Sequence, residues 1–505
     1  MQLPSTRRRS RAAVLSLTIP VALVALSAAQ AKGGELDPRF DGDGKAIVDF
    51  GGPDDPQDMA LAADGKVVVV GGHPTEDPVI GGRNNLALAR LNVDGTLDSS
   101  FGTAGKVVTD LGTASTPNAV AIQGDGKIVV AGSIAGPSGL AFLVARYSAS
   151  GALDTTFGSG GVVVTELGRP AAARALAIQA DGKVVAAGYS RVAERITLAA
   201  PSDFAIARYS ADGSLDPTFG SGGTTTLSFG EGMHARAEGL ALGSDGTIAV
   251  AGWAKPTSTG GGFGGSDFAV ARLTAAGAPD TGFDGDGRTL TDFGAAETAE
   301  DVAVTRDGKV VVVGWGEHAP LARYRPDGSL DTTFGDAGKV SAAAAAFFNA
   351  AALDAKGRVV AAGASASGED FVVARYLPGG RLDGRFGGGA TTTDFGANDS
   401  AEAVAVASDG TIVAAGRSAP PEALLGDFVV ARYLPTRCVV PKVVGKSRAS
   451  ARASLVAAGC QTGTVRSGYS RKIKRGRVIS QKPRAGTDLA EDAKVNLVVS
   501  RGRKR

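Results

Sequence analysis

Cysteine and histidine, the residues that most often act as nucleophiles and metal ligands, are scarce in this 505-residue chain. It has three histidines and two cysteines, Cys438 and Cys460, so the first 437 residues contain no thiol. The motifs H-E-x-x-H, G-x-S-x-G and C-x-x-C do not occur. Their absence argues against a zinc peptidase, a nucleophile-elbow hydrolase and a dithiol redox protein, and we expect neither a metal nor a cofactor. Catalysis by paired carboxylates stays open, because sequence does not show which acids lie together.

Large side chains and long apolar runs are also rare. Aromatic residues make up 6% of the chain, with two tryptophans, although hydrophobic residues reach 43%. Such a composition favours many small cores over one deep core. At this length we expect several folding units or one repeated unit.

One long apolar run lies at the N-terminus. It covers residues 12–28, contains Pro20, follows the basic segment Arg7-Arg8-Arg9-Ser10-Arg11 and precedes Ala29-Gln30-Ala31. That order is typical of a secretory signal peptide, so we expect residues 1–31 to be removed after Ala31 and the protein to be secreted. No membrane span would then remain, and the alternative is an uncleaved membrane anchor.

Charge divides the chain near Pro435. Residues 436–505 contain 18 Lys and Arg against three acids, a formal charge of +15, whereas residues 32–435 have 31 basic against 48 acidic residues, or −17. We therefore predict a boundary there, with a basic C-terminal part that faces a polyanion. The acidic body is not expected to bind nucleic acid.

The body contains one phrase seven times. The phrase is D-G-(K/T), replaced once by Lys356-Gly357-Arg358, then an apolar run ending in Gly and a second apolar run ending in Ala-Arg. It continues with L-D-x-x-F, replaced once by P-D-x-x-F at Phe283, and a β-branched run. Successive L-D-x-x-F phenylalanines, from Phe40 to Phe386, are 61, 56, 62, 64, 51 and 52 residues apart. This period accommodates four strands and four turns, and apolar runs such as KIVVAG suit sheets packed on both faces. The pattern predicts a β-propeller, in which radial repetition covers the sheet edges.

The two ends of the repeat region predict how the ring closes. The chain begins with L-D-x-x-F and the strand-like run 45–50, and its last repeat stops at Arg432-Tyr433 without an outer strand. We therefore predict seven four-stranded blades over residues 32–435, with residues 45–50 completing the sheet of residues 401–433. The fold class is mainly β: a propeller closed by its N-terminal strand, followed by a small α+β domain over residues 436–505.

These phrases resemble the delta-60 repeat, a family of bacterial, often exported, propeller-like repeats. The resemblance covers nearly all of residues 36–433 and implies the repeat architecture. It implies no agreed activity, so function has to be argued from individual sites.

Residues present in every repeat are expected to be structural. The arginine of Ala-Arg and the aspartate of L-D occur in equal numbers, so we predict ion pairs such as Arg146 with Asp154 and Arg208 with Asp216. A ring of arginines that binds a sugar acid is the alternative. The runs Asp41-Gly42-Asp43-Gly44 and Asp284-Gly285-Asp286-Gly287 suggest calcium, but they lack the other EF-hand positions, so solvated turns are favoured.

Irregular connections between the second and third strands, and between blades, gather on one face of a propeller. We expect any ligand site to lie on this face, while neutral drift of tolerant loops is the alternative. The candidate residues that fall in or beside these connections are His73, His234, Trp253, Trp315 and His318.

The basic C-terminal part has the motif order V-P-x-V-x-G, a helical stretch, G-x-V-I-S-Q-x-P-x-A-G-T and V-x-L-V-V-S. This order, over residues 438–501, resembles a PASTA domain, the small module appended to penicillin-binding proteins and serine/threonine kinases. The resemblance implies a helix on a small sheet and, in some members, recognition of peptidoglycan or wall polymers. In these 505 residues the motif order occurs once, without kinase or transpeptidase motifs beside it.

Two features of this domain carry specific expectations. Cys438 and Cys460 frame the helical stretch, and we predict that they form a disulfide, which suits an exported domain of this size. The basic candidates for binding an anionic wall polymer are Arg471, Lys472, Lys474, Arg475 and Arg477.

Taken together, the sequence favours an exported, non-enzymatic binding or scaffold protein held at the cell wall by its PASTA-like domain. The ligand of the propeller is not identified. The alternatives are an exported hydrolase or lyase with a carboxylate site in the propeller channel, and a purely structural surface protein.

Overall fold

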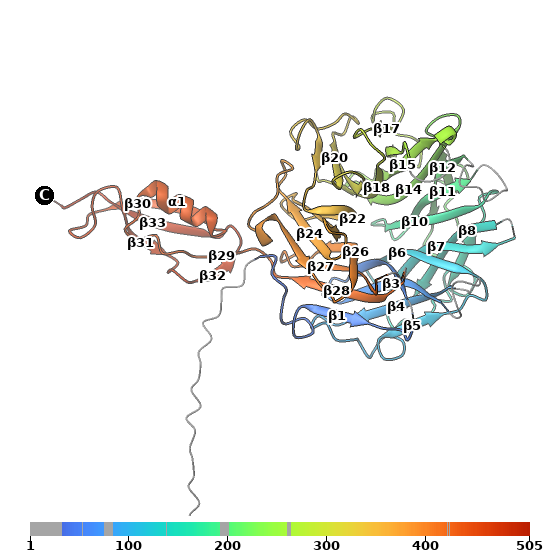
Figure 1. Ribbon diagram of the computed structural model, residues 1–505, viewed down its shortest axis with the longest axis horizontal. Helices are drawn as coiled ribbons and strands as arrows, with labels where there is room; N and C mark the ends of the chain where they lie inside the picture. The colour runs from blue at the N-terminus through green and yellow to red at the C-terminus, as the bar shows by residue number, and fades with distance from the viewer. Residues whose placement is uncertain are drawn as a thin grey trace, which may run out of the picture. The chain divides into compact units, whose positions relative to one another are not determined.

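The computed structural model describes residues 33–52, 54–74, 84–137, 139–191, 201–259, 264–421, 423 and 425–504. The expected signal peptide, residues 1–31, lies outside them. Within the described residues, strands form seven four-stranded antiparallel groups arranged as a ring, with the first strand of each group toward the centre (Figure 1). We call these groups blades 1 to 7.

Blade 1 contains β2 (Asp55–Leu61), β3 (Val67–Pro74), β4 (Asn84–Leu91) and β5 (Lys106–Thr109). Blade 2 contains β6 (Ser115–Ile122), β7 (Ile128–Gly136), β8 (Gly139–Tyr147) and β9 (Val162–Thr165). Blade 3 contains β10 (Ala171–Ile178), β11 (Val184–Arg191), β12 (Ser202–Tyr209) and β13 (Thr224–Leu227). Blade 4 contains β14 (Met233–Leu242), β15 (Ile248–Pro256), β16 (Asp267–Leu273) and β17 (Arg288–Thr291).

Blade 5 contains β18 (Thr298–Val304), β19 (Val310–Trp315), β20 (Pro320–Tyr324) and β21 (Lys339–Ser341). Blade 6 contains β22 (Ala345–Leu353), β23 (Val359–Ser365), β24 (Phe371–Tyr376) and β25 (Ala390–Thr393). Blade 7 contains β26 (Asn398–Val406), β27 (Ile412–Ala419), β28 (Asp427–Tyr433) and β1 (Lys45–Val48). Two short 3-10 turns also lie in the described residues of this region, η2 (Thr257–Thr259) and η3 (Gly387–Gly389).

The D-G steps form the turns between first and second strands. In blade 2, Gly126 has a φ of +84°, a conformation that glycine adopts without the steric penalty of a Cβ. The Asp125 carboxylate accepts the backbone N–H of Lys127 at 3.1 Å, which closes the turn. Turn chemistry therefore explains why these two residues recur.

The hydrophobic core is divided among the seven blade interfaces, as the small side chains predicted. Between blades 2 and 3, for example, Val144 and Phe142 pack with Ala186 and Ala205, and all four side chains are almost completely buried. Six further clusters of the same kind occupy the other interfaces in the described residues. Each blade is therefore stabilised mainly by its two neighbours.

The repeated arginines meet the repeated aspartates at every blade. Arg146 Nε donates to Asp154 Oδ2 at 2.8 Å, and Arg208 Nε donates to Asp216 Oδ2 at 2.8 Å. The Arg146 guanidinium also lies 4.5 Å from the centre of the Phe157 ring, a cation–π contact. Its Nη1 donates to the Ala211 carbonyl of the next blade at 2.6 Å. The arginines therefore join neighbouring repeats, which is a structural role.

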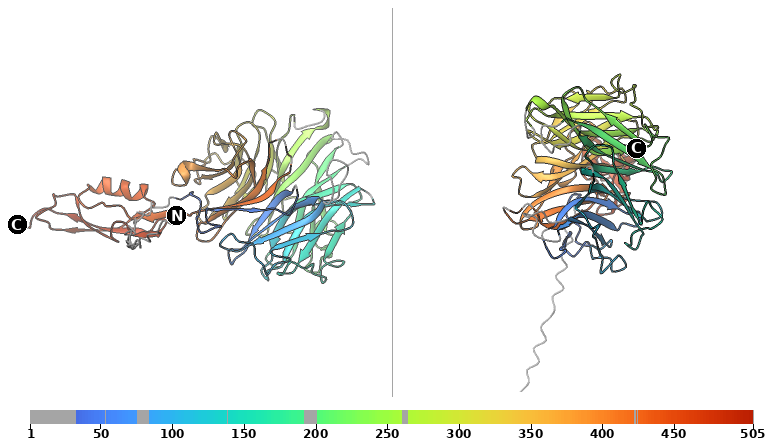
Figure 2. Two further views of the ribbon diagram at one scale, coloured as in Figure 1. Left: turned by 60° about the horizontal axis from the view of Figure 1, so that its bottom comes forward. Right: turned by 90° about the vertical axis from the view of Figure 1, so that its right-hand side faces the viewer.

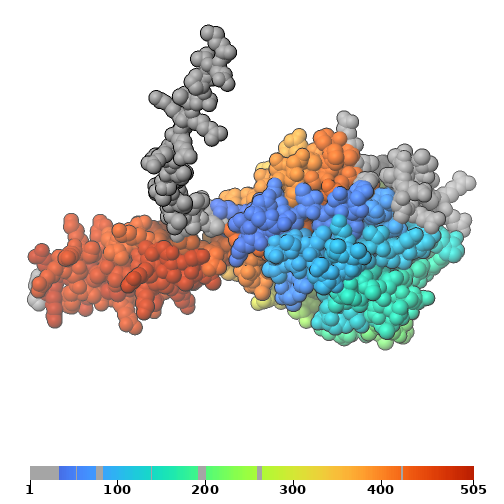
Figure 3. Space-filling view, turned by 90° about the horizontal axis from the view of Figure 1, so that it is seen from below, coloured from blue at the N-terminus to red at the C-terminus, as the bar shows by residue number. Residues whose placement is uncertain are grey.

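The ring closes as the sequence predicted. Strand β1 pairs antiparallel with β28 in the register Lys45↔Ala431, and the N-terminal strand lies beside the last blade in both views of Figure 2. Arg432 Nη2 lies 2.9 Å from Asp37 Oδ2, so the seventh arginine takes its aspartate from the other end of the chain. Figure 3 shows the N-terminal segment in contact with residues of the last blade.

Residues 437–500 form a small domain with its own core. It contains β29 (Arg437–Val439), α1 (Arg448–Ala457), β30 (Gln461–Gly468), β31 (Val478–Lys482), β32 (Asp488–Ala490) and β33 (Lys494–Ser500). The Ser447 side chain caps α1 by accepting the N–H of Ser450, and Ala451 and Leu455 face the core. The predicted disulfide between Cys438 and Cys460 is confirmed. No helix among the described residues is long and apolar enough to cross a membrane.

Candidate functional site

The innermost strand of every blade contains a β-bulge, and each bulge places one polar residue at the central channel. A bulge leaves an extra residue on one strand and turns its side chain away from the regular alternation. The seven bulged residues are Gln57, Asn118, Arg174, Glu238, Glu300, Asn349 and Glu402.

Glycine on the second strand makes each bulge possible. A Cβ on Gly132 would collide with the carbonyl oxygen of Thr116, on the strand that carries Asn118. The same collision would occur at Gly71, Gly188, Gly252, Gly314, Gly363 and Gly416. The glycine that ends the first apolar run of each repeat is therefore required by the close approach of the two backbones.

The bulged residues line a cavity of about 200 Å³ in the channel. A wider cavity of about 480 Å³ shares Gln57, Glu300, Asn349 and Glu402 with it. Its other lining residues lie at the starts of inner strands or the ends of second strands, which places it on the face of the irregular connections. We call the first the channel cavity and the second the channel mouth.

An ion pair occupies one side of the channel cavity. Arg174 Nε donates to Glu238 Oε2 at 2.7 Å, and Arg174 Nη1 donates to Asn118 Oδ1 at 3.0 Å. Arg236 Nε lies 3.6 Å from Glu238 Oε1, and the Trp253 indole also hydrogen-bonds this carboxylate. Although burial alone would raise it, these positive charges and hydrogen bonds lower the pKa of Glu238. Glu238 is therefore an ionised carboxylate whose charge is balanced by Arg174 and Arg236.

Glu300 and Glu402 lie in a different electrostatic environment. Burial, reinforced by the negative charge of Glu238, raises the pKa of Glu300 to about 7, and Thr298 Oγ1 donates to its Oε1 at 2.5 Å. Burial likewise raises the pKa of Glu402 to about 7, and Asn349 Nδ2 donates to its Oε2 at 2.8 Å. Both side chains are half-buried and border the channel cavity and its mouth. They are two of the channel carboxyl groups that can change charge near neutral pH.

Asp58 and Asp301 directly follow the bulged residues of blades 1 and 5, and their carboxylates connect neighbouring blades. Asp58 accepts the N–H groups of Met59 and Val120 at 2.7 Å, and Asp301 accepts those of Val302 and Ala351 at 2.7 and 2.8 Å. Burial raises the pKa of both carboxyl groups to about 7. Because Val120 and Ala351 belong to the next blades, these aspartates tie inner strands together around the channel.

Aromatic side chains stand at the channel mouth. Trp315 is 42% exposed, and its backbone bridges to Phe347, which joins blades 5 and 6 at this point. Asp55 and Arg417 also line the mouth, and Arg417 Nε lies 3.9 Å from Glu402 Oε1. The mouth therefore combines an aromatic surface with carboxylates and one guanidinium.

The five ligand-face candidates from the sequence do not form one site. Trp315 lines the mouth, whereas Trp253 is buried and its indole hydrogen-bonds the Glu238 carboxylate. The His234 ring packs 4.9 Å from Trp253, and its Nδ1 is 2.8 Å from Ser202 Oγ. His73 Nδ1 is 2.8 Å from Asp54 Oδ1, and exposed His318 lies beside Glu317.

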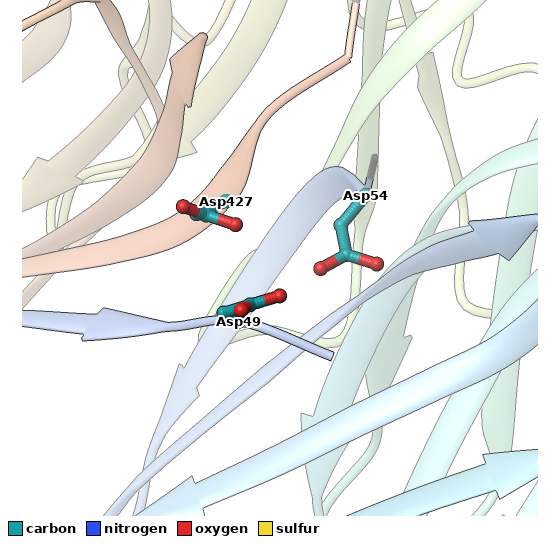
Figure 4. Close-up of side chains that lie close together, drawn as sticks. All are labelled: Asp49, Asp54 and Asp427. Carbon is teal, nitrogen blue, oxygen red and sulfur yellow. The ribbon is translucent and has the colours of Figure 1, made fainter. Parts of the chain in front are cut away.

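Three carboxylate triads lie at blade junctions in the described residues. In each, one carboxylate oxygen per residue lies within 4.8 Å of the others. The triads are Asp49 with Asp54 and Asp427, Asp267 with Asp292 and Glu297, and Asp370 with Asp394 and Asp399. Figure 4 shows the first, and burial together with the Asp427 charge raises the pKa of Asp54. These residues offer the oxygen ligands that hard cations prefer.

The Asp-Gly-Asp-Gly runs are turns without such a grouping. Asp41 and Asp284 have positive φ values of 47° and 50°. Asp286 is paired with Arg288, whose Nη2 lies 2.9 Å from Asp286 Oδ2. None of the triads in the described residues includes these aspartates.

The five basic wall-binding candidates lie together on the connection between β30 and β31. All five side chains, from Arg471 to Arg477, are exposed. The Ser470 hydroxyl accepts the N–H groups of Lys472 and Ile473 at 3.2 and 2.9 Å, and Arg477 Nη1 donates to the Gly445 carbonyl at 2.8 Å. We call residues 471–477 the basic loop.

Comparison with known families matches both parts of the chain. The description "Domain of unknown function (DUF5122) beta-propeller" matches residues 62–101, 123–157, 179–219, 243–283, 305–334 and 357–386. Each match runs from a D-G turn, or the equivalent Lys356-Gly357 turn, to the phenylalanine that closes L-D-x-x-F or, at Phe283, P-D-x-x-F. The seventh repeat is split between the chain ends, which explains six matches in seven blades. The PASTA domain matches residues 439–501.

Individual relatives are distant or short. A probable serine/threonine-protein kinase of Clostridium acetobutylicum is 38% identical over 63 residues, which is 12% of this chain and 10% of the kinase. The polysaccharide lyase Uly1 is 12% identical, covering 75% of this chain and 89% of that chain with a TM-score of 0.45. A gluconolactonase, XC5397 from Xanthomonas campestris, is 11% identical, covering 76% and 87% with a TM-score of 0.33. The chain therefore consists of a DUF5122 β-propeller repeat region followed by a C-terminal PASTA domain.

Proposed function

We propose that this is an extracellular binding protein, held at the cell wall by its PASTA domain, whose propeller presents a ligand site at the channel. The PASTA domain carries the proposal, because it suggests wall binding, and the disulfide suits a compartment outside the cytoplasm. The finer assignment is that the basic loop contacts peptidoglycan or another anionic wall polymer.

Electrostatics supports this division of tasks. The C-terminal part has a formal charge of +15 and the propeller region one of −17, so a polyanion attracts the first and repels the second. The basic loop concentrates five exposed cations within seven residues, which favours multivalent contact. Such attraction is screened by salt because the charges are exposed.

The test is co-sedimentation of the full chain with isolated cell wall. The triple substitution Arg471→Gln, Lys472→Gln and Lys474→Gln is expected to weaken binding about tenfold or more at low salt, and salt is expected to release the unaltered protein. A matched control removes three exposed arginines from the propeller: Arg169→Gln, Arg306→Gln and Arg381→Gln. The proposal fails if both triple variants bind like the unaltered chain, or if the control loses as much binding as the loop variant.

A second candidate function is that of a hydrolase or lyase, and one observation favours it. Glu300 and Glu402 border one cavity and have pKa values raised to about 7, so each can exist as an acid and as a base near neutral pH. An assay for new reducing ends on wall polysaccharide, repeated with Glu300→Gln and Glu402→Gln, distinguishes this function from binding alone.

A further inference from the structure

The channel cavity and its mouth contain many more acids than bases. Asp55, Glu300 and Glu402 stand at the mouth against Arg417. Deeper in the channel, Asp58, Glu238 and Asp301 stand against Arg174. Glu238 is already paired with Arg174 and Arg236, so the remaining carboxyl groups make the space favourable for a cation and unfavourable for an anion.

The volume of the space accommodates a small organic cation. The mouth, at about 480 Å³, leads to a channel cavity of about 200 Å³, and water occupies roughly 30 Å³ per molecule in the liquid. An ammonium group with an unbranched chain of a few methylenes fits such a volume.

Trp315 adds recognition at the rim. An indole face attracts an ammonium group and also packs against methylene groups. Trp315 is 42% exposed at the mouth, while Glu300 and Glu402 lie further along the same cavity. A chain that enters past the aromatic ring would therefore place its charged end among the carboxyl groups.

We propose that the channel binds the side chain of a lysine residue in a peptide, with its ammonium group near Glu300 and Glu402 and its methylenes against Trp315. A lysine ammonium is a compact charge with three donors on a flexible stem, so it can reach carboxyl groups that lie beyond the aromatic rim. This inference rests on the proposed function in one respect, that the propeller is the ligand-binding part. It is independent of the basic loop.

The proposal implies a definite pH dependence. Glu300 faces Glu238, Arg174, Arg236 and Thr298, and Glu402 faces Arg417, Asp55, Glu300, Asn349 and Ser400. Because burial holds the pKa of both carboxyl groups near 7, they are mostly neutral at pH 6 and mostly ionised at pH 8. A lysine ammonium has an ordinary pKa of about 10.4 and stays charged throughout. Affinity is therefore expected to rise several-fold from pH 6 to pH 8.

The test is isothermal titration calorimetry of the full chain with lysine blocked as its Nα-acetyl amide. The matched neutral ligand is the same compound acetylated at Nε, which is expected to bind at least tenfold more weakly. Trp315→Ala and the double variant Glu300→Gln/Glu402→Gln are each expected to weaken binding of the blocked lysine about tenfold. The double variant should also reduce the pH dependence, leaving Asp58 and Asp301 as the channel carboxyl groups with pKa values near 7. Glu317→Gln, an exposed acid on the same face, is the control and should bind as the unaltered chain does.

Two kinds of result would overturn the inference. Equal binding of the two lysine compounds, or no binding of either, would show that the channel does not select an ammonium group. Undiminished binding in the double variant would place the cation elsewhere. Thermal unfolding of each variant shows whether it has folded, and Glu→Gln at carboxyl groups with raised pKa values is not expected to lower stability. Neither result bears on wall binding, which the loop variants test separately.

Discussion

Removal of residues 34–52 is expected to open the propeller and unfold or aggregate most of the protein. This segment supplies β1, which covers the edge of β28, and Asp37, the partner of Arg432. Burial of Phe40 and Val48 contributes about 2 kcal/mol each, and an unpaired buried arginine costs about 3 kcal/mol. With an exposed sheet edge added, the loss approaches the whole net stability of a typical protein, about 5–15 kcal/mol. Size-exclusion chromatography and thermal unfolding measure the effect.

A rearranged chain is the control for that deletion. Gly34 N–H donates to the Leu434 carbonyl at 3.0 Å, so residues 34–52 can follow Leu434 through a short linker and still reach their native place. This permuted propeller, compared with the same chain lacking residues 34–52, is expected to stay monomeric and to keep its melting temperature. If the plain deletion were equally stable and monomeric, the closure would contribute nothing and its energetic role would be refuted.

Asp216→Ala is expected to have the largest effect of any single substitution discussed. Asp216 accepts hydrogen bonds from Arg208, from the Thr218 hydroxyl and from the Thr218 N–H, and Lys183 lies 2.9 Å away. Its removal leaves the buried Arg208 guanidinium without its carboxylate, which lowers the free energy of unfolding by about 3 kcal/mol. This loss is at the lower end of the usual range for breaking a buried ion pair, because the pair lies close to the rim of the propeller. Denaturant unfolding measures the loss, with the exposed Glu317→Ala as the control.

The pH dependence gives this prediction a second readout. The Thr218 hydroxyl, then Lys183 and the Thr218 N–H, lower the pKa of Asp216, and Arg208 adds to the effect. A lowered folded-state pKa means that the stabilisation is complete above the ordinary value near 3.8 and disappears as pH falls through the lowered value. The difference between the unaltered protein and Asp216→Ala should therefore shrink at strongly acidic pH. A deficit that is constant with pH would show that lost packing, and not the ion pair, explains the effect.

The repeats made the propeller predictable to the level of individual partners. Period, turn residues and β-branched runs indicated four strands per unit, and the missing outer strand after Arg432 indicated closure by residues 45–50. Equal numbers of arginines and aspartates indicated pairs such as Arg146 with Asp154. Such features are local, or repeated seven times, so that one chain displays them without an alignment.

The channel was harder to predict because its residues differ from blade to blade. The bulge positions hold Gln57, Asn118, Arg174 and four others, so they do not stand out as a repeated residue type. The sequence nevertheless marks the bulge positions by their spacing from the turns. Each bulged residue lies seven positions before the first residue of the D-G turn, or of the equivalent Lys356-Gly357 turn, and faces a glycine that ends the next apolar run.

The irregular face shows the limit of arguing from connections alone. Trp253 and Trp315 both fall in irregular connections, but Trp253 is buried and hydrogen-bonds Glu238, whereas Trp315 lines the channel mouth. Which side of a strand faces the channel depends on the bulge register, and loop length does not encode it. The residues of the mouth therefore required the three-dimensional structure.

Hydrogen–deuterium exchange of the full chain tests the central claim, that wall and ligand are bound by separate parts. Soluble cell-wall fragments are expected to slow exchange in residues 469–477, and blocked lysine in residues 298–302, 315–316 and 400–404. Each ligand should leave the other set unchanged. Protection of the channel segments by wall fragments, with none in the basic loop, would contradict the account.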